Sequence, residues 1–149
     1  MQTETPETYF MRLAVNLAKN CPPVTGAFSV GAIIVDQSGK EISRGFSRER
    51  DATFHAEESA IFKAKQLGLS LTGCSIYSSL EPCGARLSGK TSCCQHIIES
   101  GIIRVFYAWE EPNVFLEATG ISQLAAAGVE LVRLKGFEAD VKAVNAHLF

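Results

Sequence analysis

The sequence lacks any apolar run near the roughly 20 residues that a membrane-spanning helix needs. It also lacks a basic excess, because 14 Lys and Arg against 16 Asp and Glu give a net charge of −2. Proteins that coat nucleic acid usually carry a basic excess or stripe. The first ten residues, MQTETPETYF, are acidic and polar, unlike a signal peptide. We therefore expect no membrane association, no nucleic-acid partner and a cytoplasmic location.

The cysteine count argues against a disulfide framework, because five is an odd number and cannot be fully paired. In a reducing compartment, clusters of Cys and His more often bind metal or do chemistry than form disulfides. The chain has 149 residues, 46% of them apolar and 20% charged, which is typical of a soluble globular domain. No repeat, low-complexity tract or linker interrupts it. We expect residues 1–149 to form a single domain.

The apolar periodicity gives the order of the elements. It predicts helices over 6–20, 55–67, 93–99, about 120–128 and 138–148, and strands over 28–36, 41–47, 74–80, 102–109 and 129–134. The first helix begins with Thr5 as its cap and Pro6 at its first position. A hairpin followed by alternating helices and strands predicts a three-layer α/β/α sandwich around a central mixed five-stranded sheet.

Two short segments carry the chemistry: FHAEES at 54–59 and EPCGARLSGKTSCCQH at 81–96. His55 and the pair Cys93–Cys94 stand where predicted helices begin, and helix N-termini favour thiolates. Thiolate and imidazole are suitable ligands for Zn²⁺. His55, Cys83 and one of the two adjacent cysteines would supply three protein ligands. A fourth position left for water is the pattern of a catalytic site, not a structural one.

Glu57 follows His55 by two residues, so its carboxylate can reach a water bound by a metal beyond the helix end. H-x-E followed by P-C is typical of zinc nucleobase deaminases, whereas His55 alone would be typical of a capping or core histidine. Nine residues separate Cys83 from Cys93, in place of the two of P-C-x-x-C. Neighbours on a helix diverge by about 100°, so Cys93 and Cys94 cannot both bind one zinc ion.

The segment Pro82–Cys93, P-C-G-A-R-L-S-G-K-T-S-C, resembles the P-C-x-x-R-L-S-G-x-x-x-C loop of the fungal-type deaminases of riboflavin biosynthesis. These enzymes belong to the cytidine deaminase-like superfamily, and the similarity covers most of the chain from Phe28 onward. The resemblance implies that superfamily's fold, Cys93 as the third zinc ligand, Glu57 as the catalytic acid–base, and a homodimer or homotetramer. One departure is TGAFSVG before the first strand, which lacks the Asn of the bacterial enzymes' PNP turn.

By the same resemblance, the activity is hydrolytic deamination of an aminopyrimidine. The expected substrate is 2,5-diamino-6-ribitylamino-4(3H)-pyrimidinone 5′-phosphate or its ribosyl counterpart. Arg86 and Lys90 are the only cations between Lys65 and Arg104, which suits a sugar phosphate. The expected substrate-binding residues are Lys90, Arg86, Ser88 and Thr91.

Two other functional classes fit the same residues. One is a nucleoside, free-base or secondary-metabolite deaminase on the same scaffold. The other is a non-enzymatic, zinc-stabilised binding module, in which Lys90 and Arg86 would be solvated loop charges. The presence of Glu57 argues against the non-enzymatic module, because a purely structural zinc site does not need that carboxylate.

Overall fold

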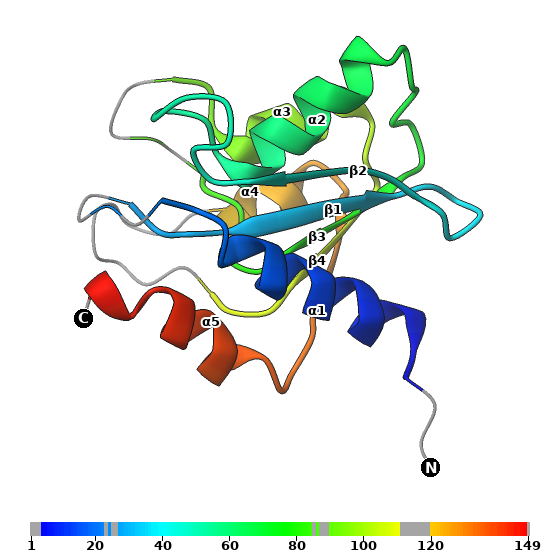
Figure 1. Ribbon diagram of the computed structural model, residues 1–149. Helices are drawn as coiled ribbons and strands as arrows, with labels where there is room; N and C mark the ends of the chain where they lie inside the picture. Colours follow the sequence, from blue (N-terminus) through cyan, green and yellow to red (C-terminus); the bar gives the residue numbers. More distant parts are fainter. Residues whose placement is uncertain are drawn as a thin grey trace.

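The computed structural model describes residues 4–22, 24, 27–84, 86, 90–110 and 120–148. Within these ranges the chain forms five strands, five α-helices and one 3₁₀ turn (Figure 1). In chain order they are α1 (Pro6–Ala18), β1 (Gly31–Val35), β2 (Glu41–Phe46), α2 (Ala56–Gln66), β3 (Ser75–Ser78), α3 (Cys93–Ser100), β4 (Arg104–Tyr107), α4 (Gly120–Ala126), β5 (Glu130–Arg133), α5 (Glu138–Val144) and η1 (Ala146–Leu148).

The sheet has the strand order β2-β1-β3-β4-β5. β1 is antiparallel to both of its neighbours, whereas β3, β4 and β5 are parallel, so the sheet is mixed as predicted. Helices α1 and α5 cover one face, and α2, α3 and α4 cover the other (Figure 1). The predicted three-layer sandwich is therefore confirmed.

β1 lies in the sheet between the two helix layers (Figure 1), and all five of its residues are buried. A strand with helices on both faces has no solvent side, which explains its continuous apolar run instead of an alternating one. The sheet approaches α1 closely at Gly31, where an added Cβ would lie 1.9 Å from the carbonyl oxygen of Ala14. Helix α1 begins as predicted, with the Thr5 hydroxyl accepting a hydrogen bond from the Thr8 backbone N–H.

Helix α2 packs on the opposite face through small residues, because Ala56, Ala60 and Ala64 are fully buried. Gly45 of β2 faces it, and an added Cβ there would lie 2.5 Å from the carbonyl oxygen of Ala56. Small side chains on both surfaces let the helix lie close to the sheet. This contact holds the first turn of α2 beside the segment that follows β3.

The first strand begins at Gly31, three residues later than the sequence predicts. The backbone N–H groups of Ser29 and Val30 donate to side chains instead of to a neighbouring strand. Ser29 N–H donates to Asn145 Oδ1 over 2.6 Å, and Val30 N–H donates to Ser47 Oγ over 2.9 Å. Asn145 lies 116 residues from Ser29, so no pattern within the strand predicts this contact.

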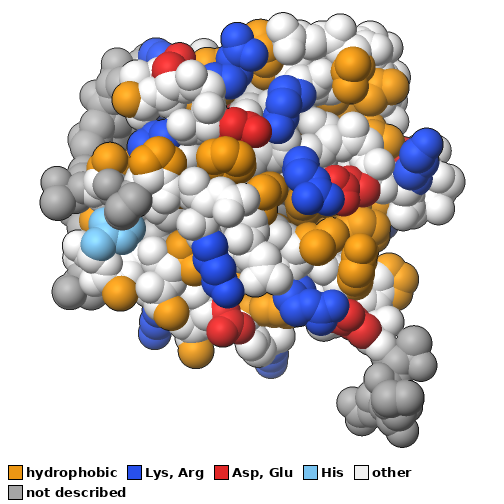
Figure 2. All heavy atoms as spheres, viewed as in Figure 1, with side chains coloured by type: hydrophobic (Ala, Val, Ile, Leu, Met, Phe, Trp, Pro, Cys, Tyr) orange, Lys and Arg blue, Asp and Glu red, His pale blue; other side chains and the backbone are white. Residues whose placement is uncertain are grey.

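The surface carries mixed charge on the face that Figure 2 shows, where Lys and Arg side chains lie beside Asp and Glu side chains. Exposed ion pairs of this kind include Arg12–Glu4 at α1 and Arg44–Glu41 on β2. Within the described ranges, every helix is too short or too polar to cross a bilayer.

Candidate metal and catalytic centre

The candidate site lies where three segments meet. His55 is the N-cap of α2, Cys93 is the first residue of α3, and Cys83 lies in the segment after β3. Helices α2 and α3 pack against each other on the same face of the sheet. As the sequence predicts, two of the three candidate ligands stand at helix starts.

The three predicted ligand atoms converge. His55 Nδ1 lies 3.2 Å from Cys93 Sγ and 3.5 Å from Cys83 Sγ, and all three ligand atoms lie within 4.8 Å of one another. Zn–S bonds of about 2.3 Å and Zn–N bonds of about 2.0–2.1 Å separate N and S ligands by about 3.5 Å at a tetrahedral ion. The observed spacing matches that figure. The donor set and its geometry therefore fit zinc.

The pKa values of the two thiols are shifted in opposite directions. The Cys93 thiol donates a hydrogen bond to the sulfur of Cys83, which lowers the pKa of Cys83 to about 4, with a further contribution from His55. The pKa of Cys93 is raised, because Cys93 donates to that thiolate and is itself fully buried. The backbone N–H of Cys93 adds a contact of 3.3 Å to Cys83 Sγ. A preformed thiolate is the state that a zinc ion requires of its ligand.

Glu57 is buried beside this cluster and interacts with the thiol of Cys93. Burial raises the pKa of its carboxyl, and the negative charge on Cys83 adds to the effect. The hydroxyl of Ser78 lies 3.3 Å from Glu57 Oε1 and donates to the Leu80 carbonyl oxygen over 2.7 Å. A carboxyl with a raised pKa next to the ligands is suited to accept and return protons near neutral pH.

Cys94 lies outside the cluster. Its sulfur lies 3.3 Å from the carbonyl oxygen of Pro82 and 3.5 Å from that of Gly120, in a fully buried setting. Cys93 and Cys94 thus diverge, as neighbours on a helix must. Of the two alternatives that the sequence leaves open, the geometry favours Cys93 as the third ligand. None of the five cysteines, all of which are described, forms a disulfide.

This assignment predicts opposite zinc contents for two neighbouring variants. Cys93→Ala is expected to lose most of its bound zinc, because it removes one of three protein ligands. Cys94→Ala is expected to keep about one zinc ion per chain and to lose some stability through the small cavity that it creates. Atomic absorption on both purified variants makes the comparison. Zinc loss in Cys94→Ala with retention in Cys93→Ala would reverse the assignment.

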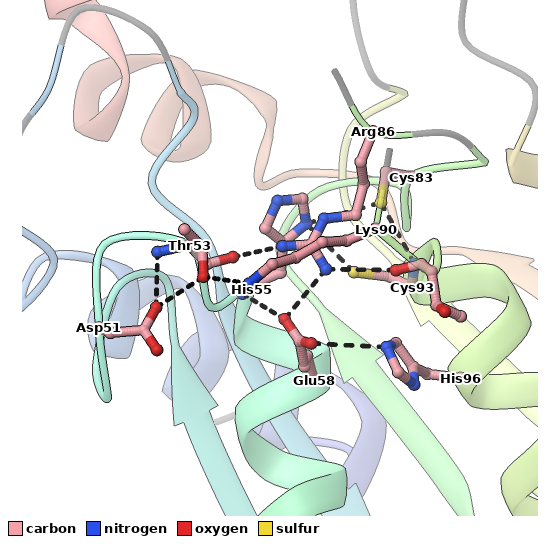
Figure 3. Close-up of polar contacts among 10 residues, drawn as sticks. Asp51, Thr53, His55, Glu58, Cys83, Arg86, Lys90, Cys93 and His96 are labelled. Atoms are coloured by element: carbon pink, nitrogen blue, oxygen red, sulfur yellow. Dashed lines mark hydrogen bonds and ion pairs between the residues drawn. The ribbon is translucent and has the colours of Figure 1, made fainter. Parts of the chain in front are cut away.

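The predicted substrate-binding residues have unequal surroundings (Figure 3). Lys90 is exposed, and its Nζ lies 2.5 Å from Thr53 Oγ1. The Arg86 side chain is only 3% exposed, and its guanidinium donates to Glu58, to the Thr91 carbonyl oxygen and to the Thr53 carbonyl oxygen. Ser88 lies outside the described residues. Lys90 is therefore the more accessible of the two cations.

The sequence interpretation missed Glu58 and His96. Glu58 Oε1 accepts a hydrogen bond from the backbone N–H of His55 over 3.2 Å, and its Oε2 lies 3.5 Å from His96 Nε2. A signal for Glu58 was present, since a Glu three residues after the N-cap is half of a capping box. His96 offered no comparable signal, because only its position in space brings it to Glu58.

Comparison with known proteins places this geometry in a family. Residues 4–109 match the model of the cytidine and deoxycytidylate deaminase zinc-binding region. The chain belongs to this zinc-binding deaminase family. The matched region contains His55, Glu57, Cys83 and Cys93, so the cluster described above lies inside the part of the chain that defines the family.

Relatives of the chain within this family include deaminases and riboflavin biosynthesis proteins. The chain is 40% identical over 151 aligned residues to the diaminohydroxyphosphoribosylamino-pyrimidine deaminase of Schizosaccharomyces pombe, covering 99% of this chain and 37% of that protein. It is 33% identical to the riboflavin biosynthesis protein RibD of Aquifex aeolicus, covering 94% of this chain and 38% of RibD. The chain thus spans about a third of the length of these curated relatives.

Solved structures agree with the family assignment. Aspergillus oryzae Rib2 deaminase, in complex with DARIPP, superposes with a TM-score of 0.82 at 27% identity, covering 94% of this chain and 90% of that one. The deaminase/reductase of Thermotoga maritima superposes with a TM-score of 0.81 at 32% identity, covering 93% of this chain and 39% of that one. The prediction of a cytidine deaminase-like fold is thereby confirmed.

Proposed function

We propose that residues 1–149 form one zinc-dependent deaminase domain that hydrolyses an aminopyrimidine of riboflavin biosynthesis and releases ammonia. The observation that carries this proposal is the convergence of His55, Cys83 and Cys93 beside the buried carboxylate of Glu57. The name of the S. pombe relative, which is 40% identical over nearly the whole chain, supports the substrate class. The substrate that we propose is 2,5-diamino-6-ribitylamino-4(3H)-pyrimidinone 5′-phosphate or its ribosyl form.

Zinc bound by His55, Cys83 and Cys93 would supply a Lewis acid that lowers the pKa of water from 15.7 to about 7. Glu57 performs the proton transfers. It accepts a proton from the attacking water, whose oxygen adds to the amine-bearing ring carbon. It passes that proton to the ring nitrogen. It then takes the proton of the newly added hydroxyl group and passes it to the amino group, which leaves as ammonia while the carbon–oxygen bond becomes a carbonyl. The raised pKa of Glu57 suits both halves of this cycle, since the same carboxyl must gain and lose a proton.

Lys90 is the residue that we propose as the principal contact for the sugar phosphate. It is exposed, lies between two of the proposed zinc ligands in the chain, and its Nζ lies beside Thr53 at the loop before α2. A group held there would project from a ring that faces the zinc ligands. Thr91 and Ser88 are proposed to assist as hydrogen-bonding residues.

Lys90→Ala is expected to lower kcat/KM for the phosphorylated substrate by about 10- to 150-fold, because charged hydrogen bonds contribute roughly 1.5–3 kcal/mol. The loss should be selective, since an unphosphorylated analogue has no anion to lose. Steady-state kinetics with both substrates, on wild type and variant, form a double-mutant cycle on the contact. Lys65→Ala, which removes an exposed lysine of α2, is the matched control.

Equal losses for both substrates in Lys90→Ala would make Lys90 a structural residue of the loop. A wild-type preference for the unphosphorylated compound would contradict the riboflavin-pathway proposal and favour a nucleoside or free-base deaminase.

A substrate panel distinguishes the functional classes. We expect ammonia release from the phosphorylated diaminopyrimidines and much slower release from dCMP, cytidine and cytosine. Turnover of dCMP as the preferred substrate would assign a different deaminase activity. Zinc binding without ammonia release from any of these compounds would support the non-enzymatic module.

Assembly and location complete the proposal. We propose a homodimer or homotetramer that works in the cytoplasm on a small-molecule substrate, without a nucleic-acid or membrane partner. The proposed thiol and imidazole ligands suit a reducing compartment, where thiols stay available to zinc.

A further inference from the structure

Glu58 contacts three separate segments of the site (Figure 3). Its Oε1 accepts from the His55 backbone N–H over 3.2 Å and from Arg86 Nη1 over 3.1 Å. Its Oε2 lies 3.5 Å from His96 Nε2, close enough for an ion pair when the imidazole is protonated. One carboxylate therefore joins the start of α2, the segment between the two proposed cysteine ligands, and α3.

These three segments are the ones that carry the proposed zinc ligands. His55 caps α2, Arg86 follows Cys83 by three residues, and His96 follows Cys93 by three residues on α3. Adjacent residues on a helix point about 100° apart. Glu57 can therefore face the ligand cluster while Glu58, the next residue, faces the surrounding segments. Glu58 thus contacts the segments that carry the proposed ligands, and it is not itself a member of the proposed ligand set.

Arg86 depends on this carboxylate. Its side chain is 3% exposed, and its two terminal nitrogens are engaged by Glu58, Thr91 and Thr53. Among the described residues, its buried Nε has no hydrogen-bond partner. A buried guanidinium needs a counter-charge, and removing one partner of such a pair is strongly destabilising. The described hydrogen bonds of Arg86 therefore all go to groups of the protein, whereas Lys90 is the more exposed of the two cations.

We infer that Glu58 and Arg86 are positioning residues, which fix His55 and Cys93 relative to Cys83 and thereby set the geometry of the metal site. Residues that orient metal ligands from outside typically affect metal affinity or activity by about 10- to 100-fold when substituted. The inference rests on the proposed zinc function, and it concerns residues outside the proposed ligand set.

The first experiment measures zinc release from the holoenzyme with a chromogenic chelator in excess. Glu58→Ala is expected to release zinc about 10- to 100-fold faster than wild type. Glu58→Gln keeps an oxygen for the His55 N–H but loses the charge that balances Arg86, so its release rate should be intermediate. Glu49→Ala is the matched control. It removes a carboxylate that binds Lys63 and Ser59 on the same helix, away from the ligand segments.

The second experiment separates positioning from substrate binding. With Arg86→Ala, kcat is expected to fall by the same factor for phosphorylated and unphosphorylated substrates, with little change in KM. The effects of Glu58→Ala and Arg86→Ala should be less than additive in the double variant, because both changes break the contact that the two side chains share. In Co²⁺-substituted protein, Glu58→Ala should shift the visible d–d absorption bands, which report ligand geometry, whereas Glu49→Ala should not.

Unchanged zinc release and an unchanged cobalt spectrum in Glu58→Ala would overturn the inference. A loss in Arg86→Ala confined to the phosphorylated substrate would also overturn it, and would place Arg86 in the substrate site. If Glu58→Ala does not fold, Glu58→Gln carries the same comparison. Zinc release needs no substrate, so a wild-type protein that holds zinc but deaminates nothing would contradict the proposed function while still testing Glu58.

Discussion

Glu57→Gln is expected to keep bound zinc and the fold but to lose about 10²- to 10⁴-fold in kcat, the contribution typical of a general acid–base group. The amide has nearly the same shape as the carboxylate, but it cannot accept the proton of water and return it to the departing amine. Glu57 is buried beside the proposed ligands and interacts with the thiol of Cys93. Steady-state ammonia release from the phosphorylated diaminopyrimidine measures the effect.

Zinc content and thermal unfolding of Glu57→Gln serve as controls, because burial of the neutral amide should leave both close to wild type. The amide removes a carboxyl whose charged form is disfavoured by burial. Near-wild-type turnover in a variant with full zinc would contradict the role assigned to Glu57. Loss of zinc together with activity would instead assign Glu57 to the metal site.

Removal of zinc is expected to abolish turnover while leaving most of the fold intact. The core rests on apolar packing between sheet and helices, and Met11 and Ile33 are fully buried and remote in sequence from the ligands. Chelation followed by circular dichroism should therefore show a folded apoprotein without activity. One equivalent of Zn²⁺ should restore turnover, since the ligand atoms already lie at spacings that suit the ion.

Cys94→Ala is the control for chelation, because it removes a thiol outside the cluster and should respond like wild type. Activity that persists in protein shown to be metal-free would contradict the zinc assignment. Complete unfolding on chelation would mean that the ion has a structural role in addition to its proposed catalytic one.

The order of elements follows from the sequence because each strand and helix carries its own apolar pattern. Helices α2 and α3 end within one residue of their predicted ends, and glycines with positive φ, Gly68 and Gly101, follow them. The predicted start of β1 was wrong by three residues, because the Ser29 N–H donates its hydrogen bond to Asn145, which lies 116 residues away in the sequence. Such a contact depends on where α5 packs, and no local pattern encodes it.

The candidate site was predictable in part from the sequence. His55, Glu57 and Cys83 follow from short motifs whose spacing the chemistry requires. Cys93 and Cys94 could not be separated from the residues alone, because a shift of one position in the start of α3 exchanges them. The structure separates them through Pro82 and Gly120, whose carbonyl oxygens lie close to the Cys94 thiol.

The unequal surroundings of Arg86 and Lys90 were not predictable from the loop that they share. Both are cations between the same two cysteines, and composition alone makes them equivalent. Arg86 is buried because Glu58, 28 residues earlier, lies at the start of the helix that packs nearby. The roles of loop residues are thus set by segments that the loop meets in space.

The most direct measurement is turnover of the phosphorylated diaminopyrimidine by the zinc-loaded protein in ¹⁸O-labelled water. We predict that each product molecule is formed with release of one ammonia and carries one oxygen from the solvent at the carbon that lost its amino group. Mass spectrometry of the product, with ammonia measured in parallel, gives both quantities. Absence of ammonia, or a product without solvent oxygen, would contradict hydrolytic deamination by this site.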